Sequence, residues 1–439
     1  MSARVAVLFD PRGAHIPRDG DADACRETAP VDELVAALRQ AQERLRAVPL
    51  DDLLGLLDAA AREWIRPNHP VAATIAETGA GFLPLWLRRG NLERVCEVAL
   101  RGNRAAADSF VPVSPGSSRL HRAQPRGLLV HWVAGNVPVL GMISVVQGLL
   151  SKNANLIKVS HQQAGVFPFF LEALSRVEDR IPGTVLTDAV RAVYASRDDA
   201  AAARGLSLAA DVRIAWGGRE AVESIMNLPR RFGTEDIVFG PKTSLAVIGR
   251  EVLADEAASR RVARRAAQDA AALDQRGCNS PHTLFVERGG AVPPQQFAAL
   301  LGEELAALAR HLPPPAITVP EAYQILGWRA EYDMRGEAWY GDSVTWSVFY
   351  AEEDQGLAAP CCGRTLFVRP VADVFEVPPL CSIHTQTAGL SVGDRRLALA
   401  EALTARGIER CTEIGAMSVY ENPWDGMYPI DRMVRWVGA

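Results

Sequence analysis

The sequence predicts an α/β protein with two doubly wound domains and a helical N-terminal region. From residue 127 onward, short apolar runs alternate with stretches of helical periodicity, which is the pattern of βαβ units around a parallel sheet. The alternation forms two blocks, one on either side of a loop that contains Cys278. With 439 residues, the chain is long enough to build two hydrophobic cores.

The N-terminal region follows a short apolar run at residues 4–9 and is expected to be helical. Apolar residues recur at spacings of three and four over 31–48, 51–66 and 82–104. Pro49 and Pro67 are expected to end the first two of these helices. Residues 1–110 are therefore assigned to this region, which a Pro-, Ser- and Gly-containing stretch separates from the first block.

The two blocks define the remaining segments. In the first, residues 111–270, the expected strands and helices are 127–133, 137–151, 154–159, 167–177, 190–194, 200–206, 212–215, 219–226, 245–248 and 254–272. In the second, residues 271–415, they are 282–286, 294–310, 321–331, 345–350, 365–368 and 395–405. Residues 416–439 are expected to pack back on the first domain. Runs this apolar are typical of strands that are buried on both faces.

Composition excludes several function classes. The chain carries 47 basic and 52 acidic residues, a net charge of −5 that argues against nucleic-acid binding. Its seven cysteines are widely spaced and contain no C-x-x-C, so reduced thiols in a cytoplasmic protein are expected, with neither disulfides nor a metal site. No signal peptide is recognisable. The uncharged stretch 127–150 is broken by Gly135-Asn136-Val137-Pro138, so no membrane span is expected.

Cys278 is the first candidate for chemistry. It lies in a Gly-Cys-Asn turn after a long helical stretch, where a thiol can be partly exposed and act as a nucleophile. The alternative is an inert loop cysteine, which on local sequence alone is the commoner case.

Three further candidates follow predicted strands of the first block. Asn136 precedes a helix and can either donate to a developing oxyanion or simply cap that helix. Lys158 ends a strand at the edge where such sheets bind ligands, or it is a solvated charge. Gly217-Gly218 forms a short turn that can admit a nucleotide phosphate, although a lone glycine pair is a weak motif.

The order of these motifs resembles the aldehyde dehydrogenase superfamily. His131-Trp132-Val133-Ala134-Gly135-Asn136-Val137-Pro138 is similar to its Trp-Asn-x-Pro corner, Leu156-Ile157-Lys158-Val159 to its ribose-binding strand end, and Gly240-Pro241-Lys242 to its Gly-Gly-Lys. Within the superfamily, the 239–248 run, the 276–281 loop and the 425–437 ending resemble acyl-CoA reductases of the bacterial luminescence (LuxC) type. The resemblance implies an aldehyde dehydrogenase-like fold, with cofactor-binding and catalytic domains in that order.

One departure from the hydrolytic members bears on the reaction. Those enzymes carry a glutamate base just before Gly-Gly-Lys, whereas Val238 stands at that position here and cannot accept a proton. Glu235 and Asp236 are out of register. An acyl-cysteine without such a base is protected from water, which favours reduction. The family's Glu-x-Phe-Gly-Pro segment is replaced by 364–370, so the sequence does not indicate how the nicotinamide ribose is held.

The resemblance implies thioester reduction to an aldehyde, with Cys278 as nucleophile and Asn136 as oxyanion donor. The cofactor-binding residues it implies are Val133, Lys158, Ser160, His161, Gly217 and Gly218. Because 159–163 has no carboxylate to repel a 2′-phosphate, NADPH is expected, with NADH possible. No base for the thiol is identifiable; His282 has the position of a core or capping histidine, and His384 lies where the family closes over its active site.

The expected partners are an acyl-CoA or a carrier-bound acyl thioester, an acyl-supplying enzyme and further copies of the chain. Two alternatives remain open. One is an NAD(P)-dependent aldehyde dehydrogenase that works towards an acid or acyl derivative, and the other is a non-catalytic acyl-binding scaffold. The sequence specifies neither the acyl group nor its donor.

Overall fold

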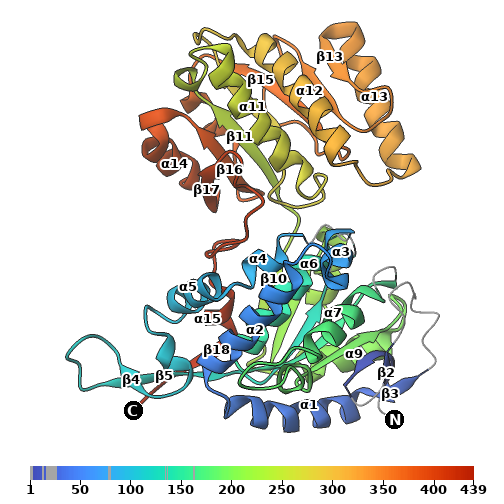
Figure 1. The fold of residues 1–439 in the computed structure, drawn as a ribbon, viewed down its shortest axis with the longest axis vertical. Coiled ribbons are helices and arrows are strands. Elements are labelled where there is room, and N and C mark those ends of the chain that lie inside the picture. The colour runs from blue at the N-terminus through green and yellow to red at the C-terminus, as the bar shows by residue number, and fades with distance from the viewer. Residues whose placement is uncertain are drawn as a thin grey trace. The chain divides into compact units, whose positions relative to one another are not determined.

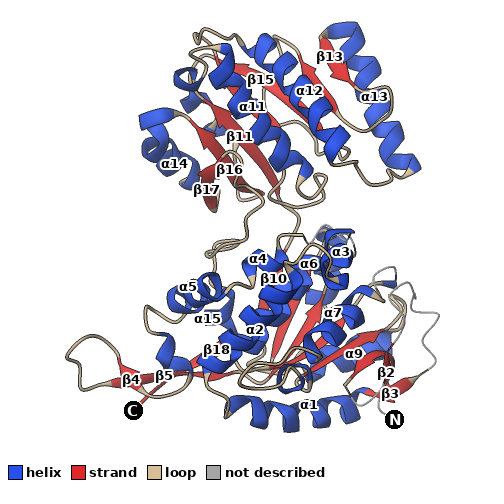
Figure 2. Cartoon of the chain, in the orientation of Figure 1, coloured by secondary structure: helices blue, strands red, loops and turns tan. Residues whose placement is uncertain are grey.

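The computed structural model describes residues 3–11, 14–15, 27–77, 81–133, 135, 137–161 and 164–439. The chain forms two compact units (Figure 1). Unit 1 comprises Met1–Gly240 and Met427–Ala439, and unit 2 comprises Pro241–Gly426. In each unit, helices flank the strands of a large sheet (Figure 2).

Unit 1 is built on an eight-stranded sheet of order β10-β9-β6-β7-β8-β1-β2, with β3 also paired to β1. Strands β6 to β10 are parallel to one another, whereas β1, β2 and β3 are added in antiparallel pairings at one edge. Their bounds are β1 Arg4–Asp10, β2 Ala14–His15, β3 Thr28–Pro30, β6 Leu128–Trp132, β7 Ala154–Lys158, β8 Val190–Tyr194, β9 Val212–Trp216 and β10 Glu235–Phe239.

Helices cover both faces of this sheet. α1 and α9 pack on one face of β6 and β7, and apolar side chains such as Leu38, Leu128 and Leu206 fill the space between them. α6 packs against β7 and α7, and α2 packs against α6. The helices of unit 1 are α1 Val31–Arg46, α2 Leu50–Trp64, α3 Pro70–Glu77, α4 Leu83–Trp86, α5 Arg89–Ala99, α6 Pro138–Leu150, α7 Val166–Ser175, α8 Thr184–Thr187, α9 Ala200–Ala209, α10 Arg219–Met226 and α15 Pro429–Met433.

A small second sheet returns the C-terminus to unit 1. β18 (Val434–Gly438) pairs antiparallel with β5 (Leu120–Pro125), which also pairs with β4 (Val111–Pro112). The returning segment therefore begins at Met427, later than the predicted boundary at residue 416.

Unit 2 contains a seven-stranded sheet of order β13-β14-β15-β12-β11-β16-β17, parallel except for β13. The strands are β11 Thr243–Ile248, β12 Pro281–Glu287, β13 Glu337–Tyr340, β14 Ser347–Tyr350, β15 Thr365–Val371, β16 Thr385–Ser391 and β17 Arg410–Glu413. The helices are α11 Glu256–Ala271, α12 Pro294–His311, α13 Val319–Arg335 and α14 Arg396–Thr404. Alternate residues of the strands enter cores on opposite faces: Leu284 packs with α11 and α12, and Phe285 packs with α14.

The division of the chain falls at Gly240, ahead of the predicted boundary between residues 270 and 271. The reason is strand pairing: β11 lies between β12 and β16 in the sheet of unit 2. The helix α11, which follows β11, packs on that sheet and therefore belongs to unit 2 as well. Among the residues described, no helix combines the length and apolar character that crossing a membrane requires.

Candidate active site

Cys278 lies in the loop between α11 and β12, and buried polar side chains hold this loop. Ser244 Oγ donates to the Cys278 carbonyl oxygen at 2.7 Å and accepts from the Thr387 N–H at 3.1 Å. Asn279 Nδ2 donates to the Met417 carbonyl oxygen at 2.8 Å. Gln275 Nε2 donates to the carbonyl oxygen of Thr365 at 2.7 Å. The backbone that carries the thiol is therefore tied to β11, β15, β16 and the loop after β17.

Several side chains around the thiol come from the amino ends of adjacent parallel strands. Lys242 directly precedes β11, Gln386 is the second residue of β16, and Glu409 directly precedes β17. Because β12, β11, β16 and β17 are neighbours and parallel, their amino ends meet at one edge of the sheet. Asp425 reaches the same place from the loop that follows β17, since Gln386 Nε2 donates to its Oδ1.

The charges at this edge form one connected group. Lys242 Nζ donates to Glu409 Oε2 at 2.6 Å and lies 3.8 Å from Asp425 Oδ1. Sequence reasoning did not identify Gln386, Glu409 or Asp425 as site residues. Lys242 was noticed only as part of the Gly-Pro-Lys motif, and Asp425 only as part of the family-like ending.

The electrostatics of the thiol follow from this setting. Burial raises the pKa of Cys278 to about 12, and the nearby Asp425 charge raises it further, whereas hydrogen bonds from Gln386 and from the residue's own N–H act in the opposite direction. Burial also raises the pKa of Asp425 to about 6, against the effects of Gln386 and Lys242. Burial and the Asp425 carboxylate thus both favour the protonated form of the Cys278 thiol.

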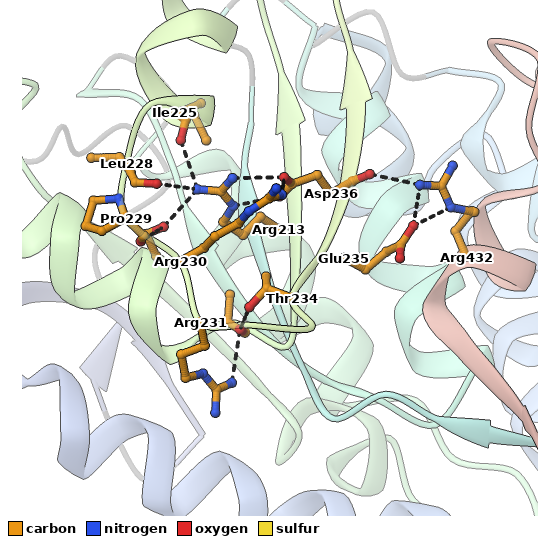
Figure 3. A network of polar contacts seen from close by, with 12 residues as sticks. Arg213, Ile225, Leu228, Pro229, Arg230, Arg231, Thr234, Glu235, Asp236 and Arg432 are labelled. Carbon is orange, nitrogen blue, oxygen red and sulfur yellow. Dashed lines mark hydrogen bonds and ion pairs between the residues drawn. The ribbon is translucent and has the colours of Figure 1, made fainter.

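The acidic residues near Val238 are engaged in ion pairs (Figure 3). Glu235 accepts from Arg432 Nε at 2.6 Å, and Asp236 accepts from Arg213 Nε at 2.7 Å and from Arg230. Both carboxylates therefore serve the packing of unit 1. Val238, two residues after Asp236 in β10, has no ionisable side chain.

The predicted cofactor residues of unit 1 gather at the carboxyl ends of its parallel strands. Val133 follows β6, Lys158 ends β7, and Gly217 follows β9. β6 lies between β7 and β9 in the sheet. After β6 the chain adds β7 and β8 on one side of this strand, and it later adds β9 and β10 on the other side. This is a topological switch point, where sheets of this kind bind ligands in the crevice outside the carboxyl ends. The Val133 N–H donates to the Lys158 carbonyl oxygen at 3.3 Å, which holds two of these ends together.

The residues at this edge suit a dinucleotide. Ser160 Oγ is buried and has no hydrogen-bond partner among the described atoms, so a hydroxyl is free for a ligand. At Gly218, the N-cap of α10, no side chain caps the helix, and an added Cβ would meet nothing within 4 Å. A phosphate can therefore approach the first N–H groups of α10. Lys158 Nζ and the His161 ring lie 5.9 and 5.6 Å from the Tyr194 ring centre. Burial lowers the pKa of Lys158.

Asn136, Gln162 and Gln163 lie outside the described residues. The histidines divide by environment. His131 is fully buried between Ser144 and Asn155, and His282 is buried, so burial lowers the pKa of each to about 4. His384 is exposed. Among the described residues, no group of three or more His, Cys, Asp or Glu side chains is arranged to hold a metal ion.

Solved structures resemble the chain in fold. Aldehyde dehydrogenase 21 of Physcomitrella patens matches with a TM-score of 0.64 and 14% identity over 100% of this chain and 95% of its own. A benzaldehyde dehydrogenase of Corynebacterium glutamicum matches with a TM-score of 0.62 and 17% identity over the same shares. The fold is therefore aldehyde dehydrogenase-like, as predicted.

Sequence comparisons are more specific. A long-chain acyl-protein thioester reductase of Aliivibrio fischeri is 30% identical over 331 residues, 72% of this chain and 64% of that protein. The protein of the same name from Photobacterium phosphoreum is 26% identical over 407 residues, 88% of this chain and 80% of its own. The model of the acyl-CoA reductase (LuxC) family matches residues 45–436. The chain therefore belongs to the acyl-CoA reductase (LuxC) family.

Proposed function

We propose that the chain reduces an acyl thioester to an aldehyde through an acyl-cysteine on Cys278. The observation that carries the proposal is the setting of this thiol. Its loop is anchored by buried hydrogen bonds, and the two carboxylates nearest the position of the hydrolytic base are held by arginines. An acyl group on Cys278 would meet no activated water from that position. The names of the curated relatives, which describe thioester reductases, agree with this chemistry.

In the loading step, Cys278 Sγ bonds to the acyl carbon and the bond from that carbon to the donor sulfur breaks. The thiol proton leaves with the donor, which departs as a free thiol, so charge balances. The tetrahedral oxyanion needs donors, and we assign these to the Cys278 N–H and the Asn136 amide. The acyl-enzyme is neutral at sulfur and awaits reduction.

The cofactor we propose is NADPH, with NADH as a weaker alternative. Lys158 and Ser160 would hold its ribose, Gly217 and Gly218 its phosphates, and Val133 and His161 would line the same edge of the sheet. A reduced nicotinamide, when bound, supplies the hydride that takes the acyl group to the aldehyde level. Initial rates with NADPH and NADH at equal concentration test this preference.

The donor we propose is an acyl-CoA or a protein-bound acyl thioester. The names of the relatives favour the second, which would require an acyl-supplying partner enzyme. Self-association of the chain is proposed on its fold alone.

The test is intact mass spectrometry after incubation with a panel of acyl-CoAs and no reductant. We expect one acyl group per chain on the wild type and on Cys362→Ala, which removes a partly exposed thiol of the same unit, and none on Cys278→Ala. Adding NADPH should then release aldehyde and no acid. Acyl loading of Cys278→Ala, or an acid product, would contradict the proposal.

A further inference from the structure

Two aromatic rings form a stacked pair at the carboxyl edge of the sheet in unit 1. Trp216 is the last residue of β9, Phe239 is the last residue of β10, and the two are partners in the parallel register of these strands. Their ring centroids lie 3.7 Å apart, and the ring planes differ by 13°. The Gly217 N–H donates to the Phe239 carbonyl oxygen at 3.2 Å, so the backbone of the two strand ends is joined as well. The Trp216 ring therefore has a fixed place at this edge.

The Trp216 indole has a hydrogen-bond donor without an acceptor. The residue is only 5% exposed, and its Nε1 is buried and unpartnered among the described residues. Ser160 Oγ, at the same edge, is also buried and unpartnered, whereas the indole of Trp436 donates to Asp431 at 2.7 Å. A buried indole N–H is usually paired, because leaving it unpaired costs free energy of folding. At an edge where such sheets bind ligands, an unpaired N–H indicates an acceptor on the ligand.

The order of the strands indicates which part of a dinucleotide this donor would meet. The sheet runs β7, β6, β9, β10 at this point. Lys158, proposed for the ribose that carries the 2′-phosphate, ends β7, and the two glycines proposed for the phosphates follow β9. The Trp216 ring lies against Phe239 at the end of β10, which is three strand spacings, or about 14 Å, from β7. A dinucleotide laid along the edge in this order would bring its nicotinamide half to the stacked pair.

We propose that Trp216 is a cofactor-binding residue whose indole N–H donates to the carboxamide oxygen of the nicotinamide. This role rests on the proposed function, because it takes the cofactor site at the carboxyl edge of unit 1 as given. An indole nitrogen is a donor only, so it can serve the carboxamide at its oxygen and not at its nitrogen. Phe239 fixes the plane of the indole. A carboxamide held by a donor in a fixed place has fewer orientations, so this contact would orient the nicotinamide ring.

The first test measures cofactor binding by calorimetry. Trp216→Phe keeps an aromatic ring beside Phe239 and removes the donor. NADPH should bind about fivefold more weakly to this variant than to the wild type, which is the net effect of one lost hydrogen bond. The fragment 2′-phospho-ADP-ribose has the same riboses and phosphates but no nicotinamide, so it should bind equally to both. Trp64→Phe is the matched control, because Trp64 is a buried tryptophan of the same unit that packs edge-on against Phe170; both affinities should stay unchanged.

A second test observes the N–H directly. The chain has nine tryptophans, so protein with isotope-labelled tryptophan gives at most nine indole signals in a proton–nitrogen correlation spectrum. The signal that is missing from Trp216→Phe should move downfield when NADPH is added to the wild type, because donation in a hydrogen bond deshields the proton. It should not move in this way with 2′-phospho-ADP-ribose. If Trp216→Phe does not fold, Phe239→Leu identifies the signal, since loss of the stacked ring changes its ring-current shift.

The possible outcomes separate the role of Trp216 from the proposed function. Equal NADPH affinity of the wild type and Trp216→Phe, or an indole signal that does not move, would overturn the role of Trp216 and leave the proposed function standing. Weaker binding of 2′-phospho-ADP-ribose to the variant as well would place the acceptor on a ribose or a phosphate and overturn the carboxamide contact. A wild type that binds neither NADPH nor NADH would refute the cofactor site itself, and the role of Trp216 with it.

Discussion

Ser244 offers a sharp test of how the nucleophile loop is held. Its hydroxyl is buried and bridges two backbone groups, the Cys278 carbonyl oxygen and the Thr387 N–H. Ser244→Ala removes both hydrogen bonds and leaves a donor and an acceptor without partners in a buried setting. Each unsatisfied buried group costs about 1–3 kcal/mol, so the loss of both partners is expected to cost about 2–6 kcal/mol.

Hydrogen–deuterium exchange of peptides that cover the loop and β16 measures this loss locally. A loss of about 2 kcal/mol corresponds to roughly 30-fold faster exchange of the Thr387 amide. Ser259→Ala is the matched control, because Ser259 is a buried serine of the same unit whose hydroxyl bonds locally, donating to the carbonyl oxygen of Asp255, the N-cap of its own helix, at 2.8 Å. That variant should change exchange by less than about tenfold. Equal, small effects in the two variants would refute the reasoning.

Three further changes probe unit 1. Lys158→Met should weaken NADPH binding about tenfold by calorimetry, and an unchanged Kd would remove Lys158 from the cofactor site. The variant should not lower the melting temperature, because the half-buried ammonium loses solvation in the folded chain. The pKa of His131 falls from 6.5 in the unfolded chain to about 4, so its contribution to stability is present above pH 6.5 and is lost as pH falls towards 4. Urea unfolding of His131→Gln should therefore show a smaller decline over this range, by on the order of 3 kcal/mol. Arg213→Met should lower the free energy of unfolding by about 3–5 kcal/mol, because Asp236 loses its buried guanidinium partner and two carbonyl oxygens lose their donor. Arg230, which also pairs with Asp236, is exposed, so Arg230→Met should cost less than about 1 kcal/mol.

Hydrophobic patterning predicted the apolar strands well and missed the polar ones. β8 was expected at 190–194 and spans Val190–Tyr194, because each of its residues fits a buried apolar run. β16 was not expected, since Thr385-Gln386-Thr387 reads as loop composition although all three residues are buried. β10 was missed for a similar reason, because it begins with Glu235 and Asp236, whose charges are neutralised by arginines distant in the sequence.

Two of the three lysines in the sequence, Lys152 and Lys242, illustrate what local sequence can and cannot specify. Lys152 has a left-handed backbone, and its buried ammonium pairs with Asp108, so it is a structural residue. Lys242 pairs with Glu409 across 167 residues of sequence. In sequence, nothing distinguishes these two environments, because in each case the partner is brought in only by the tertiary fold.

The two units place their chemistry-bearing residues at opposite ends of their strands. In unit 1, Val133, Lys158 and Gly217 follow or end parallel strands, as the rule for doubly wound sheets predicts. In unit 2, Lys242 and Glu409 precede strands, so a search at carboxyl ends passes over them. Once β16 and its register are known, the residues at the amino ends of the parallel strands of unit 2 can be identified from the sequence. Asp425 remains beyond such a rule, because it lies in a loop and its place at this edge is set by its contacts with Gln386 and Lys242. Cys278 could therefore be proposed as the nucleophile from a local motif, whereas the polar residues at the amino edge of the same sheet became visible only when the strands were paired.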